Sequence, residues 1–142
     1  MIGKTINIII ADDNSSFIKG LQFILSRSKS YKVIDVCSDG KELIESQQLH
    51  NADLVLTDIE MPNMNGIESG KRICFMYPKL PMIALTMHIE KIFLIDIIRA
   101  GFKGFIYKPE VPKQLIKVIT QVLSNNFVFP ENLKIDRNGG LL

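Results

Sequence analysis

Polar side chains follow several apolar runs of this sequence, at places where strands of a sheet would end. Two such runs end on carboxylates, the first on Asp12 and Asp13 and the second on Asp58. Two later runs end on Thr86 and on Lys108. Because the carboxyl ends of parallel strands meet at one edge of a sheet, we expect these side chains to converge there.

Such a cluster has a definite chemistry. Three crowded carboxylates raise one another's pKa unless a cation compensates their charge. Magnesium fits best, because it prefers oxygen ligands and keeps coordination positions open for phosphate oxygens. Lys108 and Thr86 supply hydrogen-bond donors for a phosphoryl group. Since an aspartate can itself attack phosphorus, the residues predict a site that phosphorylates its own carboxylate.

The elements that must position these residues follow from the alternation of short apolar runs with amphipathic stretches. This βα alternation predicts an α/β fold, with a parallel sheet covered by helices on both faces. We predict strands at 7–11, 33–37, 54–58, 82–86 and 105–108. We predict helices at 15–25, from 40 onward, at 66–77, at 89–100 and from about 112 onward.

Composition limits the class of protein. The 142 residues are 46% hydrophobic and 23% charged, which suits one domain. No apolar run approaches a membrane span, the N-terminus has no signal-peptide run, and two cysteines are too few for a disulfide framework. We therefore expect a cytoplasmic protein. With 17 basic and 15 acidic residues scattered along the chain, nothing marks a nucleic-acid surface.

Taken together and in order, the motifs resemble the receiver domain of bacterial two-component response regulators. The resemblance covers about 6–125, and implies residues 5–125 as the receiver domain and 126–142 as a tail or the start of a linker. It also implies a flavodoxin-like (CheY-like), doubly wound, five-stranded parallel sheet of order 2-1-3-4-5 with five helices. The motifs are Ile-Ala-Asp12-Asp13-Asn, Leu-Thr-Asp58-Ile-Glu-Met-Pro, Leu-Thr86-Met-His and Gly-Phe105-Ile-Tyr-Lys108-Pro.

The resemblance assigns roles to the acidic residues. It implies that Asp58 is the phosphoacceptor and a ligand of Mg²⁺. Asp13 matches the direct magnesium ligand, and Asp12 assists it. The backbone carbonyl of Glu60 matches the third protein ligand.

The resemblance also assigns the residues that respond to phosphorylation. Thr86 matches the switch hydroxyl, and Phe105 the aromatic switch residue whose ring turns inward as Thr86 moves. Lys108 matches the family's catalytic cation, and the peptide between Lys108 and Pro109 matches its cis bond.

Two features depart from the usual pattern of the family. Phe102 stands where many relatives have alanine, so its turn must make room for a bulky ring. Glu60 and His88 hold the variable positions after Asp58 and Thr86, which flank the site and influence how water reaches an acyl phosphate. His88 alone is typical of a solvated loop residue.

Several functions remain open at this point. The leading hypothesis is a phosphorylation switch served by a sensor histidine kinase, which catalyses its own phosphorylation and dephosphorylation but is not an enzyme in the usual sense. An aspartyl-nucleophile phosphatase is an alternative, although Glu60 stands where such enzymes have a second aspartate. A constitutive interaction module is another. Flavin or dinucleotide binding is disfavoured, because polar residues at 12–16 replace a glycine-rich phosphate loop.

The predicted fourth helix bears on partners. Apolar residues lie nearly all round it, and we expect Ile92 and Ile95 to be partly exposed. In receivers the fourth helix, fifth strand and fifth helix form the readout face, so this surface is either an interface, including a possible homodimer, or ordinary surface scatter. The pattern favours receivers of the LuxR or NarL type, which control transcription. DNA binding would then belong to an output domain outside these residues, and no membrane partner is expected.

Overall fold

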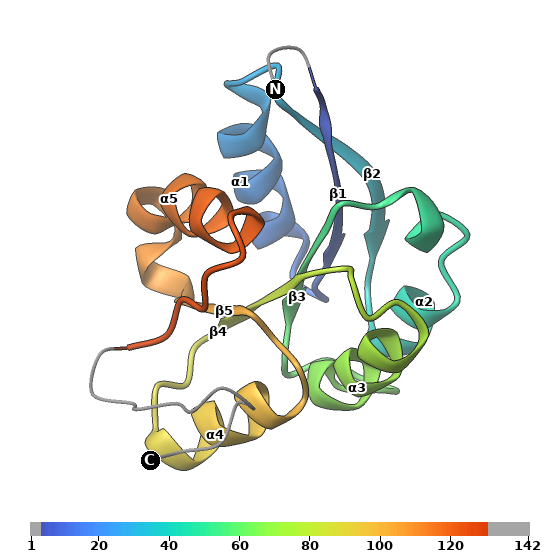
Figure 1. The fold of residues 1–142 in the computed structure, drawn as a ribbon, viewed down its shortest axis with the longest axis vertical. Coiled ribbons are helices and arrows are strands. Elements are labelled where there is room, and N and C mark those ends of the chain that lie inside the picture. The colour runs from blue at the N-terminus through green and yellow to red at the C-terminus, as the bar shows by residue number, and fades with distance from the viewer. Residues whose placement is uncertain (1–3, 131–142) are drawn as a thin grey trace.

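A parallel five-stranded sheet forms the centre of the structure, a computed structural model that describes residues 4–130 (Figure 1). Its order is β2-β1-β3-β4-β5, as predicted. The strands β3 and β4 are buried along their whole length, which is why their sequences are almost continuously apolar. The strands are β1 Ile6–Ala11, β2 Tyr31–Cys37, β3 Leu54–Asp58, β4 Met82–Thr86 and β5 Gly104–Tyr107.

Helices cover both faces of the sheet, so the doubly wound architecture is confirmed. The helices α1 and α5 pack on one face, and α2, α3 and α4 lie on the other (Figure 1). The described residues thus contain the five α-helices that the sequence predicts, together with two short 3₁₀ turns. The helices are α1 Ser15–Ser26, α2 Gly40–Ile44, α3 Gly66–Met76, α4 Lys91–Arg99 and α5 Val111–Leu123, and the 3₁₀ turns are η1 Leu49–Asn51 and η2 Lys108–Glu110. No helix in the described part of the chain is long and apolar enough to cross a membrane.

Side-chain caps fix the loops at the carboxyl edge of the sheet. Asn14, Asp39 and Asn65 each precede a helix, and each side chain accepts a hydrogen bond from a backbone N–H of the first turn. Such caps satisfy N–H groups that have no partner inside the helix. The turns after β1, β2 and β3 are therefore anchored directly to α1, α2 and α3.

The chain after β5 differs from its prediction. Strand β5 ends at Tyr107, and Lys108 opens the 3₁₀ turn η2 instead of closing the strand. The predicted cis bond between Lys108 and Pro109 is wrong, because no peptide bond of the described residues is cis. Trans is the preferred isomer even before proline, by about 0.5–1 kcal/mol, and here the chain turns straight into η2 with Pro109 in its first turn.

Phe102 obtains the room that its ring requires from a glycine on α3. Its side chain is wholly buried. A Cβ built on Gly70 would lie 2.5 Å from Cε2 of the Phe102 ring, a distance that packed atoms do not tolerate. The absence of a side chain at position 70 therefore lets this ring fill the space between α3 and the turn after α4.

The residues after α5 also contact the sheet. Asn125 adopts a left-handed conformation, with φ of 67°, and ends the helix. Its N–H donates to the carbonyl of Val122, and the N–H of Asn126 donates to that of Gln121, a Schellman arrangement. Val128 then pairs in parallel with Gly104 of β5. We call Asn126–Pro130 the edge strap; it begins the segment predicted as a tail or linker, and positions 131–142 of that segment lie outside the described residues.

Candidate functional site

The carboxyl edge of the sheet brings the predicted acidic residues together. Asp12 follows β1 directly and is wholly buried, whereas Asp13 next to it is exposed. Asp58 is the last residue of β3 and is also buried. One carboxylate oxygen from each of the three residues lies within 4.8 Å of the other two.

Lys108 is the cation that faces this cluster. Its Nζ lies 2.9 Å from Oδ2 of Asp12 and 3.2 Å from Oδ2 of Asp58. The same ammonium lies 4.5 Å from the centre of the Phe17 ring on α1, so one side of it is covered by an aromatic face. One ammonium among three carboxylates leaves the site with a local negative charge, opposite in sign to the chain's net charge of +2.

These contacts shift the acid–base properties of both groups. Burial of the Asp58 carboxylate raises its pKa, and the charge of Asp12 raises it further, against the opposing effect of Lys108. Burial lowers the pKa of Lys108, but its contacts with Asp12 and Asp58 outweigh this and leave it raised. Lys108 is therefore held as a cation, while Asp58 carries its negative charge at some cost.

The orientation of Asp58 exposes one oxygen to the cation. Its Oδ1 accepts a hydrogen bond of 2.7 Å from the backbone N–H of Ile59, while Oδ2 faces Lys108. A carboxylate held in this way has a defined oxygen on the side of the site. This is the geometry that a nucleophilic carboxylate needs.

The donor set suits a hard divalent cation. Oδ1 of Asp12 accepts a hydrogen bond from the N–H of Asn14, but its buried Oδ2 has no hydrogen-bond partner apart from the ion pair with Lys108. Lys108 is thus the charged partner of this buried oxygen, and a carboxylate oxygen has lone pairs for a metal ion as well. With Asp13 and Asp58 alongside, the oxygen donors fit Mg²⁺.

The two predicted switch residues lie on the neighbouring strands. Thr86 closes β4 and is buried, and its Oγ1 accepts a hydrogen bond of 3.0 Å from the N–H of His88. Phe105 lies in β5 with its ring buried on the α4 side of the sheet. The predicted site residues therefore come from the ends of β1, β3 and β4 and from in and after β5.

Comparison with known proteins agrees with this site. The family model described as "Response regulator receiver domain" matches residues 8–120. The chain belongs to the response regulator receiver family. Response regulators are signalling switches and not classical enzymes, which favours the switch over the phosphatase alternative.

The relatives of this receiver are named as response regulators or as regulatory proteins, some of them transcriptional. It is 28% identical over 117 residues to the transcriptional regulatory protein DegU of Brevibacillus brevis, covering 82% of this chain and 50% of DegU. It is 30% identical over 116 residues to the oxygen regulatory protein NreC of Staphylococcus carnosus, covering 81% of this chain and 54% of NreC. The receiver thus spans about half the length of these relatives.

A solved receiver has the same fold. The isolated receiver domain of RcsB from Salmonella enterica serovar Typhimurium, determined with the phosphomimetic BeF₃⁻, superposes with a TM-score of 0.81 at 27% identity. The match covers 90% of this chain and 95% of the RcsB domain. The fold predicted from the sequence is therefore confirmed.

One contact at the mouth of the receiver's site was not predicted. Nε2 of His88 contacts Oε1 of Glu60, and Nδ1 of His88 lies 3.6 Å from Oε2 of Glu90. The His88 ring also packs against Phe93 of α4, with 5.0 Å between centroids. The sequence places Glu60 and His88 beside the site, but it carries no signal that they meet, because they follow different strands. Among the described residues, this pair links the loop after Asp58 to the start of α4.

Proposed function

We propose that this receiver is a Mg²⁺-dependent phosphoacceptor that takes a phosphoryl group from a sensor histidine kinase onto Asp58. One observation carries the proposal: Oδ2 of Asp58 is buried in an acidic cluster and faces Lys108 at 3.2 Å. A nucleophilic oxygen and a fixed cation are thus side by side. Phosphoryl transfer depends mainly on such positioning and charge stabilisation.

The acidic residues divide into ligands and acceptor. Asp13 would bind Mg²⁺ directly, with Asp12 assisting, and Asp58 and the backbone carbonyl of Glu60 would complete the protein ligands. The clustering of one carboxylate oxygen from each of Asp12, Asp13 and Asp58 supports this assignment. When bound, the ion supplies positive charge that offsets the carboxylates and the incoming phosphoryl oxygens.

The transfer itself is a single displacement. A carboxylate oxygen of Asp58 forms a bond to phosphorus, and the bond from phosphorus to the donor imidazole breaks, its electron pair staying on that nitrogen. Lys108 donates a hydrogen bond to a phosphoryl oxygen as negative charge develops there. Thr86 accepts from the N–H of His88, so its own hydroxyl hydrogen is available to a second phosphoryl oxygen.

The response would then pass from Thr86 to Phe105 and the face of α4, β5 and α5. Ile92 on α4 supports a partner surface there, since its side chain is 75% exposed and large and apolar. A second copy of the chain is the proposed partner on this face.

We propose further that this receiver acts in the cytoplasm and controls transcription through an output module that binds DNA. The similarity to DegU, which is named a transcriptional regulatory protein, supports control of transcription. Such a module would lie outside these residues.

The test is transfer of label from a kinase carrying radioactive phosphohistidine. Wild type should take up the label in Mg²⁺, and chelation with EDTA should abolish uptake. Asp58→Asn should take up none, because an amide cannot form the acyl phosphate. Asp53→Asn, just before the start of the same strand, should behave as wild type. Uptake retained by Asp58→Asn would exclude Asp58 as the acceptor.

A further inference from the structure

The edge strap continues the sheet beyond β5. The N–H of Phe105 donates to the carbonyl of Val128 at 3.0 Å, and the N–H of Val128 donates to the carbonyl of Lys103 at 2.9 Å. Strand β5 is the last strand of the sheet, and an uncovered edge strand invites pairing with other chains. The strap therefore supplies hydrogen-bond partners to the backbone of β5, which would otherwise be uncovered on this side. One of the β5 residues that it pairs with is Phe105, the predicted switch residue.

The register places two aromatic side chains next to each other. Since Val128 pairs with Gly104, the residues that follow, Phe129 and Phe105, lie on the same face. Phe129 packs against the core cluster that contains Phe105, whereas Val128 packs against the cluster on the α5 side. Pro130 restricts Phe129 to an extended backbone, which suits a strand. The strap thus carries a direct neighbour of the Phe105 ring.

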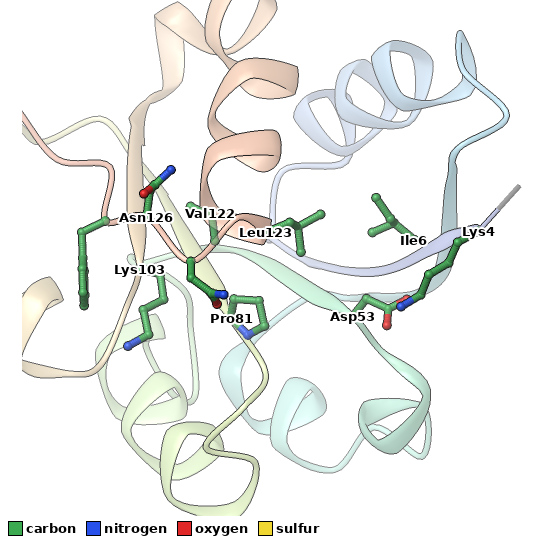
Figure 2. Close-up of a pocket in the computed structure, with 10 residues that line it drawn as sticks. Lys4, Ile6, Asp53, Pro81, Lys103, Val122, Leu123 and Asn126 are labelled. Carbon is green, nitrogen blue, oxygen red and sulfur yellow. The ribbon is translucent and has the colours of Figure 1, made fainter. Parts of the chain in front are cut away.

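Open space flanks the strap on both sides. A cavity of about 600 Å³ is lined by Leu94, Phe105 and Phe129, among others. A second cavity, of about 590 Å³, lies on the other side, where Asn126 and Lys103 line it together with Lys4 from the start of the chain (Figure 2).

Two sheet hydrogen bonds and the packing of Val128 and Phe129 hold the strap beside these cavities. Phe127 is half exposed and contacts the Nζ of Lys103 at 4.7 Å from its ring centre. A short segment with two sheet hydrogen bonds and two partly buried side chains, next to open space on both sides, can leave without unfolding the domain.

We propose that the strength with which the edge strap docks on β5 depends on the position of the Phe105 ring. The strap is held firmly while that ring is buried, as it is in this structure. When the ring turns into the cavity it shares with Phe129, it takes the space beside Phe129 and the strap loosens. Phosphorylation of Asp58, by keeping the ring inward, tightens the hold on the chain that continues from Pro130. This last step rests on the proposed function.

The test follows amide hydrogen exchange at Val128 and Phe105 by NMR, with and without Mg²⁺ and beryllofluoride as the phosphoryl mimic. In wild type, exchange at Val128 should slow several-fold when the mimic binds. In Phe129→Ala this response should be lost while uptake of label at Asp58 stays unchanged. The matched control Phe127→Ala removes a ring from the same strap on the exposed side, and it should keep the response.

The outcomes separate the two proposals. If amides around Asp58 and Thr86 respond to the mimic but Val128 does not, the coupling is wrong and the switch stands. If Phe129→Ala responds as wild type does, Phe129 does not couple the strap to the Phe105 ring.

If no amide at the site responds to the mimic, the proposed function fails. The strap is then tested in Phe105→Ala without any mimic. Exchange at Val128 equal to that of wild type would overturn the proposal that docking of the strap depends on the Phe105 ring, and altered exchange would support it.

Discussion

Charged side chains hold the carboxyl edge of the sheet together, whereas backbone hydrogen bonds hold its outer edge at β5. At the carboxyl edge, the ammonium of Lys108 lies 2.9 Å from a carboxylate oxygen of Asp12 and 3.2 Å from one of Asp58. Both carboxylates are buried and stand where strands end. At the outer edge, the strap lies on two backbone hydrogen bonds between two cavities. The first region is tightly placed and electrostatically unfavourable, whereas the second is favourable in its pairing but loosely packed.

This difference indicates a division of labour. A crowded, rigid cluster changes its energy strongly when a ligand changes its charge, but it moves little. A weakly held segment changes its position in response to a small energy. Thr86 and Phe105 lie between the two regions, on β4 and β5, so a change in charge at one edge can become a change in order at the other.

The largest expected effect is on the rate of phosphorylation, which should depend on the carboxyl edge and not on the outer edge. Lys108→Ala should slow phosphorylation of Asp58 by roughly 10²–10³-fold, because a fixed donor to the developing charge is lost. Lys103→Ala removes a lysine beside the strap and should leave the rate unchanged. Initial rates of label transfer at fixed Mg²⁺ measure both variants. A wild-type rate in Lys108→Ala would contradict the electrostatic role of this residue.

The second prediction concerns stability and its pH dependence. In EDTA at pH 7, Asp58→Asn should raise the free energy of unfolding by on the order of 1 kcal/mol, because a buried repulsive charge is removed. The folded state holds the Asp58 proton more tightly than the unfolded state, whose pKa is near 3.8. Wild-type stability from this group therefore falls as pH rises through the raised pKa of the folded state.

The advantage of Asp58→Asn should accordingly vanish below pH 3.8, where the wild-type carboxyl is protonated in both states. Urea denaturation of both proteins at several pH values measures the difference. An advantage that is equal at all pH values would show that packing, and not charge, is responsible.

The smallest effect is expected at the outer edge. Phe129→Ala should lower the free energy of unfolding by roughly 1 kcal/mol or less, because the strap can leave while the rest stays folded. Ile97→Ala, in the buried face of α4, should cost about 2–5 kcal/mol in the same urea titration. A comparable loss in both variants would mean that the strap is an integral part of the core.

The sequence was most informative where a strand ends on a polar residue. The bounds of β3 and β4 were predicted to the residue, because their apolar runs stop at Asp58 and Thr86. The helix ends shift by a few residues; α4 begins at Lys91 rather than Ile89, since periodicity does not show where capping starts. The convergence of Asp12, Asp13 and Asp58 followed from topology alone.

The features that escaped prediction depend on contacts between distant residues. Residues 127–129 are of types that favour strands, but the sequence does not show what they pair with, because the partner Gly104 precedes α5 in the chain. The contact between Glu60 and His88 likewise joins two loops that only the fold brings together. Local patterns predict elements and the edge where they end, but not which exposed side chains meet there.

Positions 70 and 102 share one volume in the core: the Phe102 ring fills the space that a side chain at Gly70 would need. An alanine at position 70 alone collides with the ring, and a small residue at position 102 alone leaves a hole. The two positions therefore offer few viable single steps, whereas a paired exchange conserves the filled volume. Libraries that vary this domain for new signalling specificity should change these positions together or leave both alone.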